Sequence, residues 1–419
     1  MQASQVYVNA WSSVKRIVSR CFQNGIGVLL DFHAVPGGAN KEEHSGTCSG
    51  KAELWGDRFN LDLTTRCLRF MAEEVASSLE LAGVIGIQLC NESLWDPPGM
   101  YPWYDRAISE LSNISNTLPI YISDGWDLNR ALQYAKEKNS VHQNHCPIIV
   151  DTHKYYTFSA KDTSRSPYDL IGQVWTELGE LDAMSGNVFD HTGAVAIYVG
   201  EYSCALAPQT WEKAPADEKE GLMRRFGNAQ CSMWQAKASG SAFWTLKMDW
   251  MDGWEWGFKH QSNAGAVVAP KCMGLSGREV GDRLKKAEGE RGARMTNAMD
   301  AHCEFWDRTA GKQGFEHWRF ADGWHLGWSD ARDFFGARLG RTVPSRGGSG
   351  RYGHADESAM SMETGDGLVG ADKIGALDLW VLKRMKEQRV ARRDECPFGW
   401  EWEQGFRAGV RAFEECVSV

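Results

Sequence analysis

Short apolar runs alternate with amphipathic stretches along the first two-thirds of the chain. Most residues of these runs are β-branched or aromatic, and apolar residues follow one another directly, which is typical of strands buried on both faces of a parallel sheet. The six runs are 26–31, 84–89, 118–123, 147–151, 195–199 and 241–245. Helical patterns between them, such as 61–81 and 218–238, are long enough to form crossover connections. The alternation predicts an α/β fold with a parallel sheet.

Polar and aromatic side chains follow the runs at the points where the predicted strands end. They are His33, Asn91, Glu92, Asp124, His153, Tyr155, Glu201, Trp244 and Lys247. Functional groups at the ends of many successive strands favour a (β/α)8 TIM-type barrel, because such barrels build their active sites from those ends. In an open sheet they would gather near one switch point. No glycine-rich phosphate-binding motif follows a strand, so nucleotide binding has no support.

Six strands are two fewer than a closed barrel needs. A helix-like segment, 7–21, precedes the first run, so we expect an incomplete barrel from which the two leading strands are missing. Two open edges would make such a sheet prone to aggregation. The alternatives are that further strands have gone unrecognised or that the remaining elements pair differently.

The composition changes after about residue 270. Residues 278–308 form a long charged helical pattern, 340–370 form a loop rich in Gly and Ser, and 371–389 form another helix. We therefore expect a barrel domain over 1–277 and an all-helical extension over 278–419. A weak repeat in the extension relates 318–327 to 400–409, with aromatic residues and glycines at three- and four-residue spacing. This spacing favours helix packing in the core over a ligand site.

The composition argues against several classes of function. The chain has 419 residues and a formal net charge of −9, so it lacks the basic excess that binding to nucleic acid requires. No apolar run is long enough to cross a membrane, and no signal peptide is recognisable. The eleven cysteines form no CxxC pair, which indicates reduced thiols and no zinc site. As written, the chain is expected in the cytoplasm, and secretion is the alternative if the true N-terminus is missing. The oligomeric state is not predicted.

Two glutamates end strands that lie three apart in the predicted sheet, Glu92 and Glu201. In a closed barrel such strands face each other across the mouth. Two carboxyl groups about 5–5.5 Å apart can act as a retaining glycosidase, one as the acid/base and the other as the nucleophile. Asn91 could donate a hydrogen bond to a sugar 2-hydroxyl. Tyr155 could hold Glu201 ionised.

The remaining candidates would shape the same cleft. His33 and His153 would supply polar walls, Trp244 would offer a flat face to a sugar ring, and Asp124 and Trp126 would add further contacts. Each of these residues alone would more often be structural than functional. Their joint occurrence at successive strand ends is what points to a carbohydrate-binding cleft.

The order of these residues resembles glycoside hydrolase family five. The segments 30–40, 44–46, 199–203 and 243–247 are similar to its fungal exo-β-1,3-glucanase branch, over about 7–258. The resemblance implies that Glu92 is the acid/base and Glu201 the nucleophile. It further implies hydrolysis of a β-1,3-glucan or a related β-glucoside, without a metal or an organic cofactor.

Two departures from the family qualify this expectation. Ser93 stands where the family usually has Pro, beyond the acid. The family also places an Arg that supports the nucleophile on its second strand, which would lie upstream of Met1. A truncated chain is therefore expected, and a functional shortened barrel is the alternative. Other possible functions are a carbohydrate-binding pseudoenzyme or inactive fragment, with the helical extension as a partner-binding module.

Overall fold

The computed structural model describes residues 9–184, 186–248, 254–310, 314–340 and 376–418. It contains one six-stranded sheet in which every neighbouring pair is parallel and the order follows the sequence, from β1 to β6. The strands are β1 (Val28–Asp31), β2 (Val84–Gln88), β3 (Ile120–Ser123), β4 (Ile148–Lys154), β5 (Ile197–Tyr202) and β6 (Gly240–Phe243). Each of the six apolar runs forms one of these strands. The predicted α/β fold with six consecutive parallel strands is confirmed.

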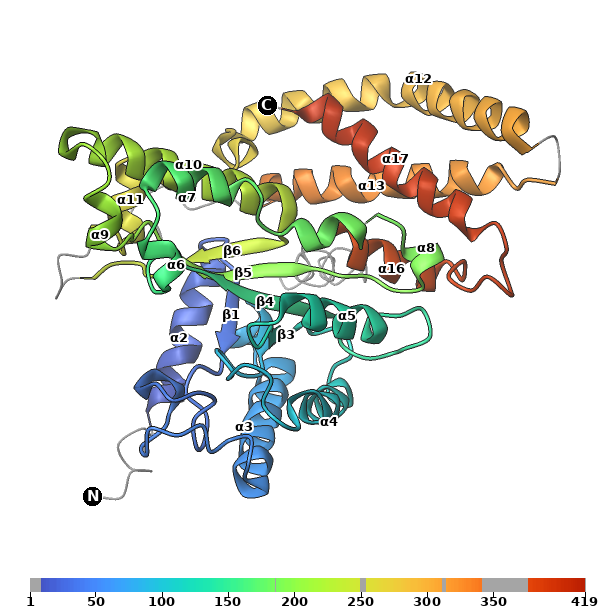
Figure 1. Cartoon of the computed structure of the whole chain (residues 1–419). Helices are drawn as coiled ribbons and strands as arrows, with labels where there is room; N and C mark the ends of the chain where they lie inside the picture. The colour runs from blue at the N-terminus through green and yellow to red at the C-terminus, as the bar shows by residue number, and fades with distance from the viewer. Residues whose placement is uncertain (1–8, 185, 249–253, 311–313, 341–375, 419) are drawn as a thin grey trace, which may run out of the picture.

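Helices connect the strands and follow the outside of a curled sheet (Figure 1). In the sheet region they are α2 (Ala10–Gln23), α3 (Arg58–Ser77), α4 (Met100–Ser112), α5 (Leu128–Lys138), α6 (Ala160–Thr163), α7 (Pro167–Val174), α8 (Val188–His191), α9 (Pro208–Trp211), α10 (Lys219–Lys237) and α11 (Phe258–Asn263). In the extension they are α12 (Gly277–Ala310), α13 (Trp318–Gly340), α16 (Leu377–Glu387) and α17 (Gly399–Val417). The predicted helical extension is therefore present. Most of the expected Gly/Ser-rich loop, 341–370, lies outside the described residues.

The outer face of the sheet forms the main core. Ile87, Ile120, Val150 and Ile197 are fully buried there, because alternate residues of each strand point toward the surrounding helices. The helices bury their apolar stripes against these residues, as with Leu68 of α3. The opposite face is also buried along part of the strands, and burial on both faces explains why the strands are almost continuously apolar in sequence.

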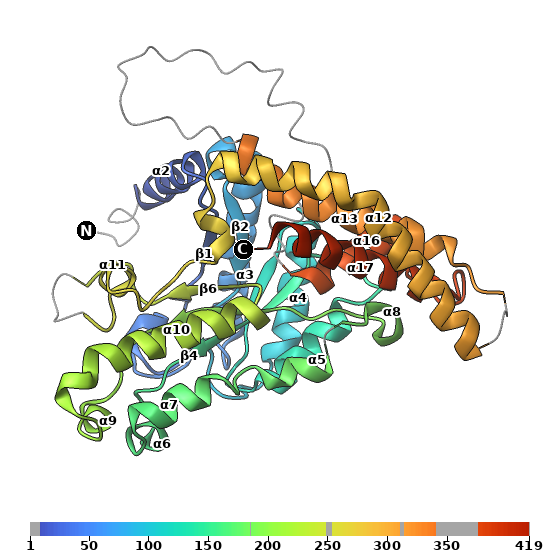
Figure 2. The same cartoon turned by 90° about the horizontal axis from the view of Figure 1, so that it is seen from above.

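The inner face of the sheet is covered by the helical extension only toward the amino ends of the strands. Toward their amino ends, Tyr121 and Ile149 belong to a second core cluster together with Trp380 of α16 and Phe406 of α17. The helical extension therefore shares a core with the sheet. Figures 1 and 2 show α13, α16 and α17 on the α8 side of the molecule, away from α6 and α9. This arrangement leaves the carboxyl ends of the strands uncovered by the extension.

A buried carboxylate ties the extension to the helix that precedes β5. Oε1 and Oε2 of Glu403 accept hydrogen bonds from the backbone N–H groups of Val188 and Phe189, at 2.8 and 2.7 Å. These are two of the free N–H groups at the start of α8. Arg407 pairs with the same carboxylate at 2.7 Å. The interaction satisfies a helix terminus that would otherwise be buried without partners.

The aromatic–glycine repeat packs α13 against α17. A β-carbon at Gly327 would overlap the carbonyl oxygen of Phe406, and one at Gly409 would overlap that of Trp324. The glycines thus let the two backbones touch, while the aromatic rings of Trp324 and Phe406 are fully buried beside them. The expectation that the repeat serves core packing is confirmed for these rings, whereas Trp318 is half exposed.

Among the described residues, no helix combines the length and the apolar character needed to span a bilayer.

Candidate active site

The candidate site lies at the carboxyl ends of the strands, where successive strands deliver their polar residues to one place. Glu92 follows β2, whereas His153 and Glu201 are paired residues in β4 and β5. Parallel strands align their carboxyl ends along one edge, and the curl of the sheet turns these ends toward each other. His33, after β1, and Trp244, after β6, stack with ring centroids 6.0 Å apart. The two edge strands therefore approach each other at this end.

Glu92 is held between two histidines. Nδ1 of His153 lies 2.8 Å from Oε1 of Glu92, and Nε2 of His44 lies 3.1 Å from Oε2. The side-chain amide of Asn40 donates to the backbone carbonyl of Glu92 at 2.9 Å, which fixes the peptide that follows β2. The Glu92 side chain remains 17% exposed, so a ligand in the cleft can reach it.

Glu201 is oriented by a tyrosine. The hydroxyl of Tyr155 donates to Oε2 of Glu201 at 2.6 Å, as the sequence led us to expect. Phe158 and Trp256 pack around the Tyr155 ring, with centroids 5.4 and 5.8 Å away, and hold it in place. Nδ1 of His153 lies 3.6 Å from the same carboxylate oxygen. A single histidine thus lies beside both glutamates.

The two carboxylates approach each other closely. One carboxylate oxygen of Glu92, one of Glu201 and a ring nitrogen of His153 all lie within 4.8 Å of one another. Carboxyl groups about 5–5.5 Å apart suit a mechanism in which one of them attacks the sugar directly, whereas about 6.5–9.5 Å leaves room for a water. The geometry is compatible with the first arrangement.

The pKa values of the two glutamates shift in opposite directions. Burial raises the pKa of the Glu201 carboxyl and the charge of Glu92 adds to the rise, and together these outweigh the opposing effects of His153 and Tyr155. Burial also acts to raise the pKa of Glu92, but the hydrogen bond and charge of His153 and the charge of His44 outweigh it and lower the pKa. Without substrate, Glu92 is therefore the more acidic of the pair.

His153 itself lies among three carboxylates. Burial alone would lower its pKa, but the carboxylates of Asp151, Glu92 and Glu201 raise it well above the ordinary value. Nε2 of His153 lies 3.0 Å from Oδ2 of Asp151, which in turn accepts a hydrogen bond from Gln88 at 2.7 Å. The protonated ring is the positive charge that allows these acidic groups to lie together.

This charge makes stability depend on pH. Because the folded-state pKa of His153 is raised, its stabilising effect is complete below the ordinary value of 6.5 and is lost as pH rises toward the folded value. Over that window we expect the free energy of unfolding to fall by up to about 1.4 kcal/mol per pH unit. Urea unfolding of the wild type and of His153→Gln across pH 6–9 measures the effect. Identical slopes for the two proteins would contradict it.

Other predicted site residues play different parts. Asp124 is buried, and both oxygens of its carboxylate bond to the protein itself. Oδ2 accepts a hydrogen bond from the Thr152 hydroxyl at 2.7 Å, and Oδ1 accepts one from the backbone N–H of Trp126 at 2.9 Å. It therefore positions Trp126, whose ring is half exposed and whose Nε1 donates to the Ser93 carbonyl at 2.8 Å. Asn91 is buried, and Trp244 keeps 39% of its surface exposed.

Sequence reasoning missed two residues that contact the site. His44 lies in a segment noted only for its family resemblance, yet its ring contacts Glu92. Asp151 ends a predicted strand two residues before His153, and this strand-end position could have marked it as a site residue. A β-carbon at Gly200 would overlap Oδ1 of Asp151, so glycine at that position makes room for the carboxylate. Both omissions concern residues that act through a neighbour.

Two clusters have the spacing of a metal site within the described residues. One is Glu92, His153 and Glu201; the other is His302, His317 and Glu401 in the extension. In the first, the carboxylates raise the pKa of His153 well above its ordinary value, and a protonated imidazole does not bind a metal. We therefore interpret the first cluster as acid–base chemistry.

Comparisons with known proteins identify the chain's relatives. The family model of the glucan 1,3-beta-glucosidase 3 C-terminal domain matches residues 287–417. Glucan 1,3-beta-glucosidase 3 of Schizosaccharomyces pombe is 29% identical over 343 residues, which cover 80% of this chain and 67% of that protein. The chain is similar to fungal glucan 1,3-beta-glucosidases.

A second relative extends the similarity to nearly the whole chain. An uncharacterized glycosyl hydrolase of Saccharomyces cerevisiae is 28% identical over 410 residues, covering 97% of this chain and 69% of that protein. The resemblance to the glycosidases seen in the sequence is therefore confirmed. Among solved structures, the rutinosidase from Aspergillus niger shares 14% identity with a TM-score of 0.49, over 62% of this chain and 72% of that chain. That similarity is too low to support any conclusion beyond the strand topology described above.

The comparisons leave three expectations untested. The division into domains at 277 and 278 stays a prediction, as do the catalytic roles of Glu92 and Glu201 and the sugar contacts of the surrounding residues.

Proposed function

We propose that this relative of the glucan 1,3-beta-glucosidases is a retaining β-glycoside hydrolase acting on a β-1,3-glucan or a related β-glucoside. Glu201 is the nucleophile and Glu92 the acid/base. The observation that carries the proposal is the approach of the two carboxylates to within 4.8 Å at the carboxyl ends of the strands. The substrate class rests on the names of the relatives.

The reaction proceeds by two displacements at the anomeric carbon. An oxygen of Glu201 attacks this carbon, the bond to the leaving oxygen breaks, and Glu92 gives that oxygen its proton. A covalent glycosyl–enzyme results. Glu92 then accepts a proton from water, whose oxygen attacks the same carbon and releases Glu201. No metal or organic cofactor is needed for this sequence.

The surrounding residues support these steps. The hydrogen bond from Tyr155 and the charge of His153 both oppose the rise in the pKa of Glu201, and so favour its ionised form. Asn91 is placed next to the acid/base, where we assign it the sugar 2-hydroxyl. His33 and Trp244, stacked on each other, form an aromatic wall at the junction of the edge strands. We assign this wall and the exposed ring of Trp126 to sugar contacts.

Removal of the acid/base should affect substrates unequally. We expect Glu92→Ala to slow the hydrolysis of laminari-oligosaccharides by roughly 10²–10⁴-fold, because their leaving oxygen needs a proton. A 2,4-dinitrophenyl β-glucoside needs none and should form the glycosyl–enzyme at near the wild-type rate. Added azide should then give the β-glucosyl azide. Steady-state kinetics with both substrates and proton NMR of the product measure these outcomes, and an equal loss on both substrates would count against the role of Glu92.

A carbohydrate-binding pseudoenzyme is the second candidate, and two observations favour it. The pKa shifts oppose the assigned roles: burial and Glu92 raise the pKa of Glu201, although a nucleophile must be ionised. His153 and His44 lower the pKa of Glu92, although an acid must hold a proton. Among the described residues, no arginine forms an ion pair with Glu201. Binding of laminari-oligosaccharides, followed by calorimetry, without any release of glucose would support this alternative. Hydrolysis with initial formation of the β-anomer would support the retaining enzyme.

A further inference from the structure

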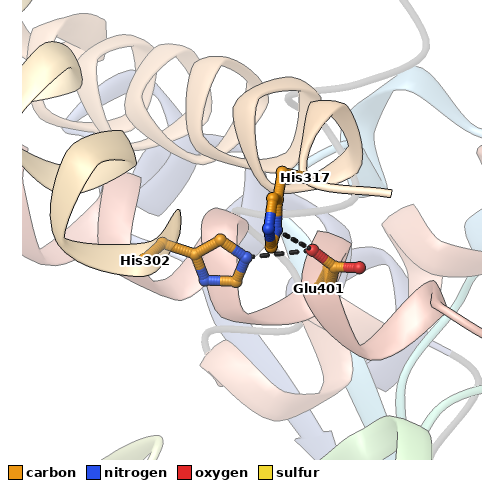
Figure 3. Close-up of side chains that lie close together, drawn as sticks. All are labelled: His302, His317 and Glu401. Carbon is orange, nitrogen blue, oxygen red and sulfur yellow. Dashed lines mark hydrogen bonds and ion pairs between the residues drawn. The ribbon is translucent and has the colours of Figure 1, made fainter. Parts of the chain in front are cut away.

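The helical extension contains a buried group of metal-ligand side chains that the proposed reaction does not use. His302 comes from α12, His317 directly precedes α13, and Glu401 comes from α17. Figure 3 shows the three side chains pointing toward one another. Glu401 is fully buried and His302 is 7% exposed. Residues from two helices and from the turn before a third thus converge on one point.

The donor atoms have nearly the spacing that a metal ion imposes. Nε2 of His302 lies 3.0 Å from Oε2 of Glu401, and Nδ1 of His317 lies 2.8 Å from the same oxygen. All three donor atoms lie within 4.8 Å of one another. Ligands bound tetrahedrally to zinc at about 2.0–2.2 Å are about 3.3–3.6 Å apart, so the two contacts with Glu401 must open by roughly half an ångström.

The second partners of His317 and Glu401 are compatible with a bound cation. Nε2 of His317 faces Oδ1 of Asp307 at 3.4 Å, the carboxylate–histidine arrangement that commonly orients a metal-binding histidine. If Nε2 carries the proton toward Asp307, Nδ1 presents its lone pair to Oε2 of Glu401. In that tautomer a cation between the two atoms would bind both lone pairs, which at 2.8 Å would otherwise repel. Oε1 of Glu401 is already satisfied by the backbone N–H of Glu316 at 2.9 Å.

The surroundings keep both rings in place. His302 stacks on Phe320 with centroids 4.1 Å apart, and His317 stacks on Phe315 at 5.4 Å. A metal ion can reach the site from solvent past His317 and Asp307, because their side chains are 19% and 38% exposed.

We propose that His302, His317 and Glu401 form a binding site for a divalent transition-metal ion, with zinc the best match to this ligand set. A fourth coordination position is left for water. The ion links α12, α13 and α17, and its two positive charges compensate the buried carboxylate. The site is separate from the carboxylate pair of the proposed active site, and it does not depend on the proposed function.

Sequence spacing gives no sign of this site. His302 and His317 lie fifteen positions apart, and Glu401 is a further 84 residues along the chain. No short motif therefore joins the three ligands, and only the packing of α17 against the other helices brings Glu401 to the histidines.

The test uses the full chain, reduced and freed of metal by a chelator. Zinc alone is titrated against a chromogenic competitor, and thermal unfolding is followed with and without zinc. We expect one tight equivalent per chain and a higher Tm. Cobalt(II), used as a spectroscopic probe, should give absorption from nitrogen and oxygen ligands without a thiolate charge-transfer band. A thiolate band would place the ion on the cysteines and overturn the proposal.

Conservative variants locate the ion. His302→Gln and His317→Asn keep an amide that can donate to Glu401 but remove a metal ligand. Loss of a residue that only hydrogen-bonds a ligand lowers metal affinity by at most roughly 100-fold, so these two variants should lower zinc affinity by more than that. Asp307→Asn should lower affinity by roughly 10- to 100-fold. His325→Gln, an exposed position on α13, is the matched control and should bind as the wild type does.

Three further outcomes would overturn the proposal. The first is an absence of tight zinc binding by the wild type, which would leave only a hydrogen bond between His317 and Glu401. The second is unchanged binding by the His302 and His317 variants. The third is loss of binding on Glu92→Gln, which would place the ion in the active site. If the histidine variants do not fold, an anomalous-scattering peak at the zinc edge in wild-type crystals decides the position.

Discussion

Turnover of a 2,4-dinitrophenyl β-glucoside is expected to fall by on the order of 10⁴-fold or more in Glu201→Ala, since the variant lacks the attacking oxygen of the covalent step. The leaving group needs no proton, so the loss reports on Glu201 and not on Glu92. Circular dichroism and Tm should stay close to the wild type, because the Glu201 side chain is partly exposed and its removal opens the cleft.

Azide provides the decisive second measurement. In Glu201→Ala the small anion can occupy the space of the missing carboxylate and attack the anomeric carbon from that side, releasing dinitrophenolate. The product should be the α-glucosyl azide, the opposite anomer to that expected from Glu92→Ala. Proton NMR distinguishes the two anomers. The matched control is Glu73→Ala, an exposed position on α3, which should keep wild-type turnover.

Two results would contradict the assignment of Glu201. Wild-type rates in Glu201→Ala would show that the reaction proceeds without this carboxylate. A β-glucosyl azide from the same variant would show that the nucleophile lies on the other side of the sugar.

The largest expected loss of stability follows from filling the glycine contacts between α13 and α17. Gly327→Ala and Gly409→Ala each place a β-carbon against a backbone carbonyl of the facing helix. Backbone cannot give way as a side-chain end can, so we expect each change to lower the free energy of unfolding by about 3 kcal/mol, the upper end for overpacked cores. Urea denaturation measures the loss.

The long helix α12 offers the matched control. A β-carbon at Gly289 or Gly292 would meet nothing within 4 Å. Alanine there should leave stability unchanged or raise it by up to about 1 kcal/mol, the difference in helix propensity. Equal effects of the α12 and α13 substitutions would show that the helix contact does not limit stability.

The shared core predicts how far this damage spreads. Phe406, beside Gly409 in the packed face of α17, belongs to the cluster that covers the amino ends of the strands. Separation of α13 from α17 should therefore weaken the sheet as well. The helical extension is part of the folded core around Tyr121 and Ile149, which its sequence alone did not indicate.

Local patterns in the sequence determined the strands and the order of the site. Consecutive apolar residues mark a strand buried on both faces, and the polar residue that ends each run marks the edge where a ligand can bind. The sequence alone therefore pairs Glu92 with Glu201. The glycines at 327 and 409 were likewise recognisable, since their spacing follows one helix face.

Only the tertiary structure decided what these residues contact. His44 and Asp151 reach the site through loop conformation and sheet curl, and the Asp124 carboxylate is used by Thr152 and Trp126 inside the protein. The opposite pKa shifts of the two glutamates depend on the same contacts with histidines and on burial. The order of hydrophobic and polar residues along the chain is enough to predict strands and helices. Electrostatic interactions and contacts between helices far apart in sequence depend on distances in space, which the spacing of residues in the sequence does not specify.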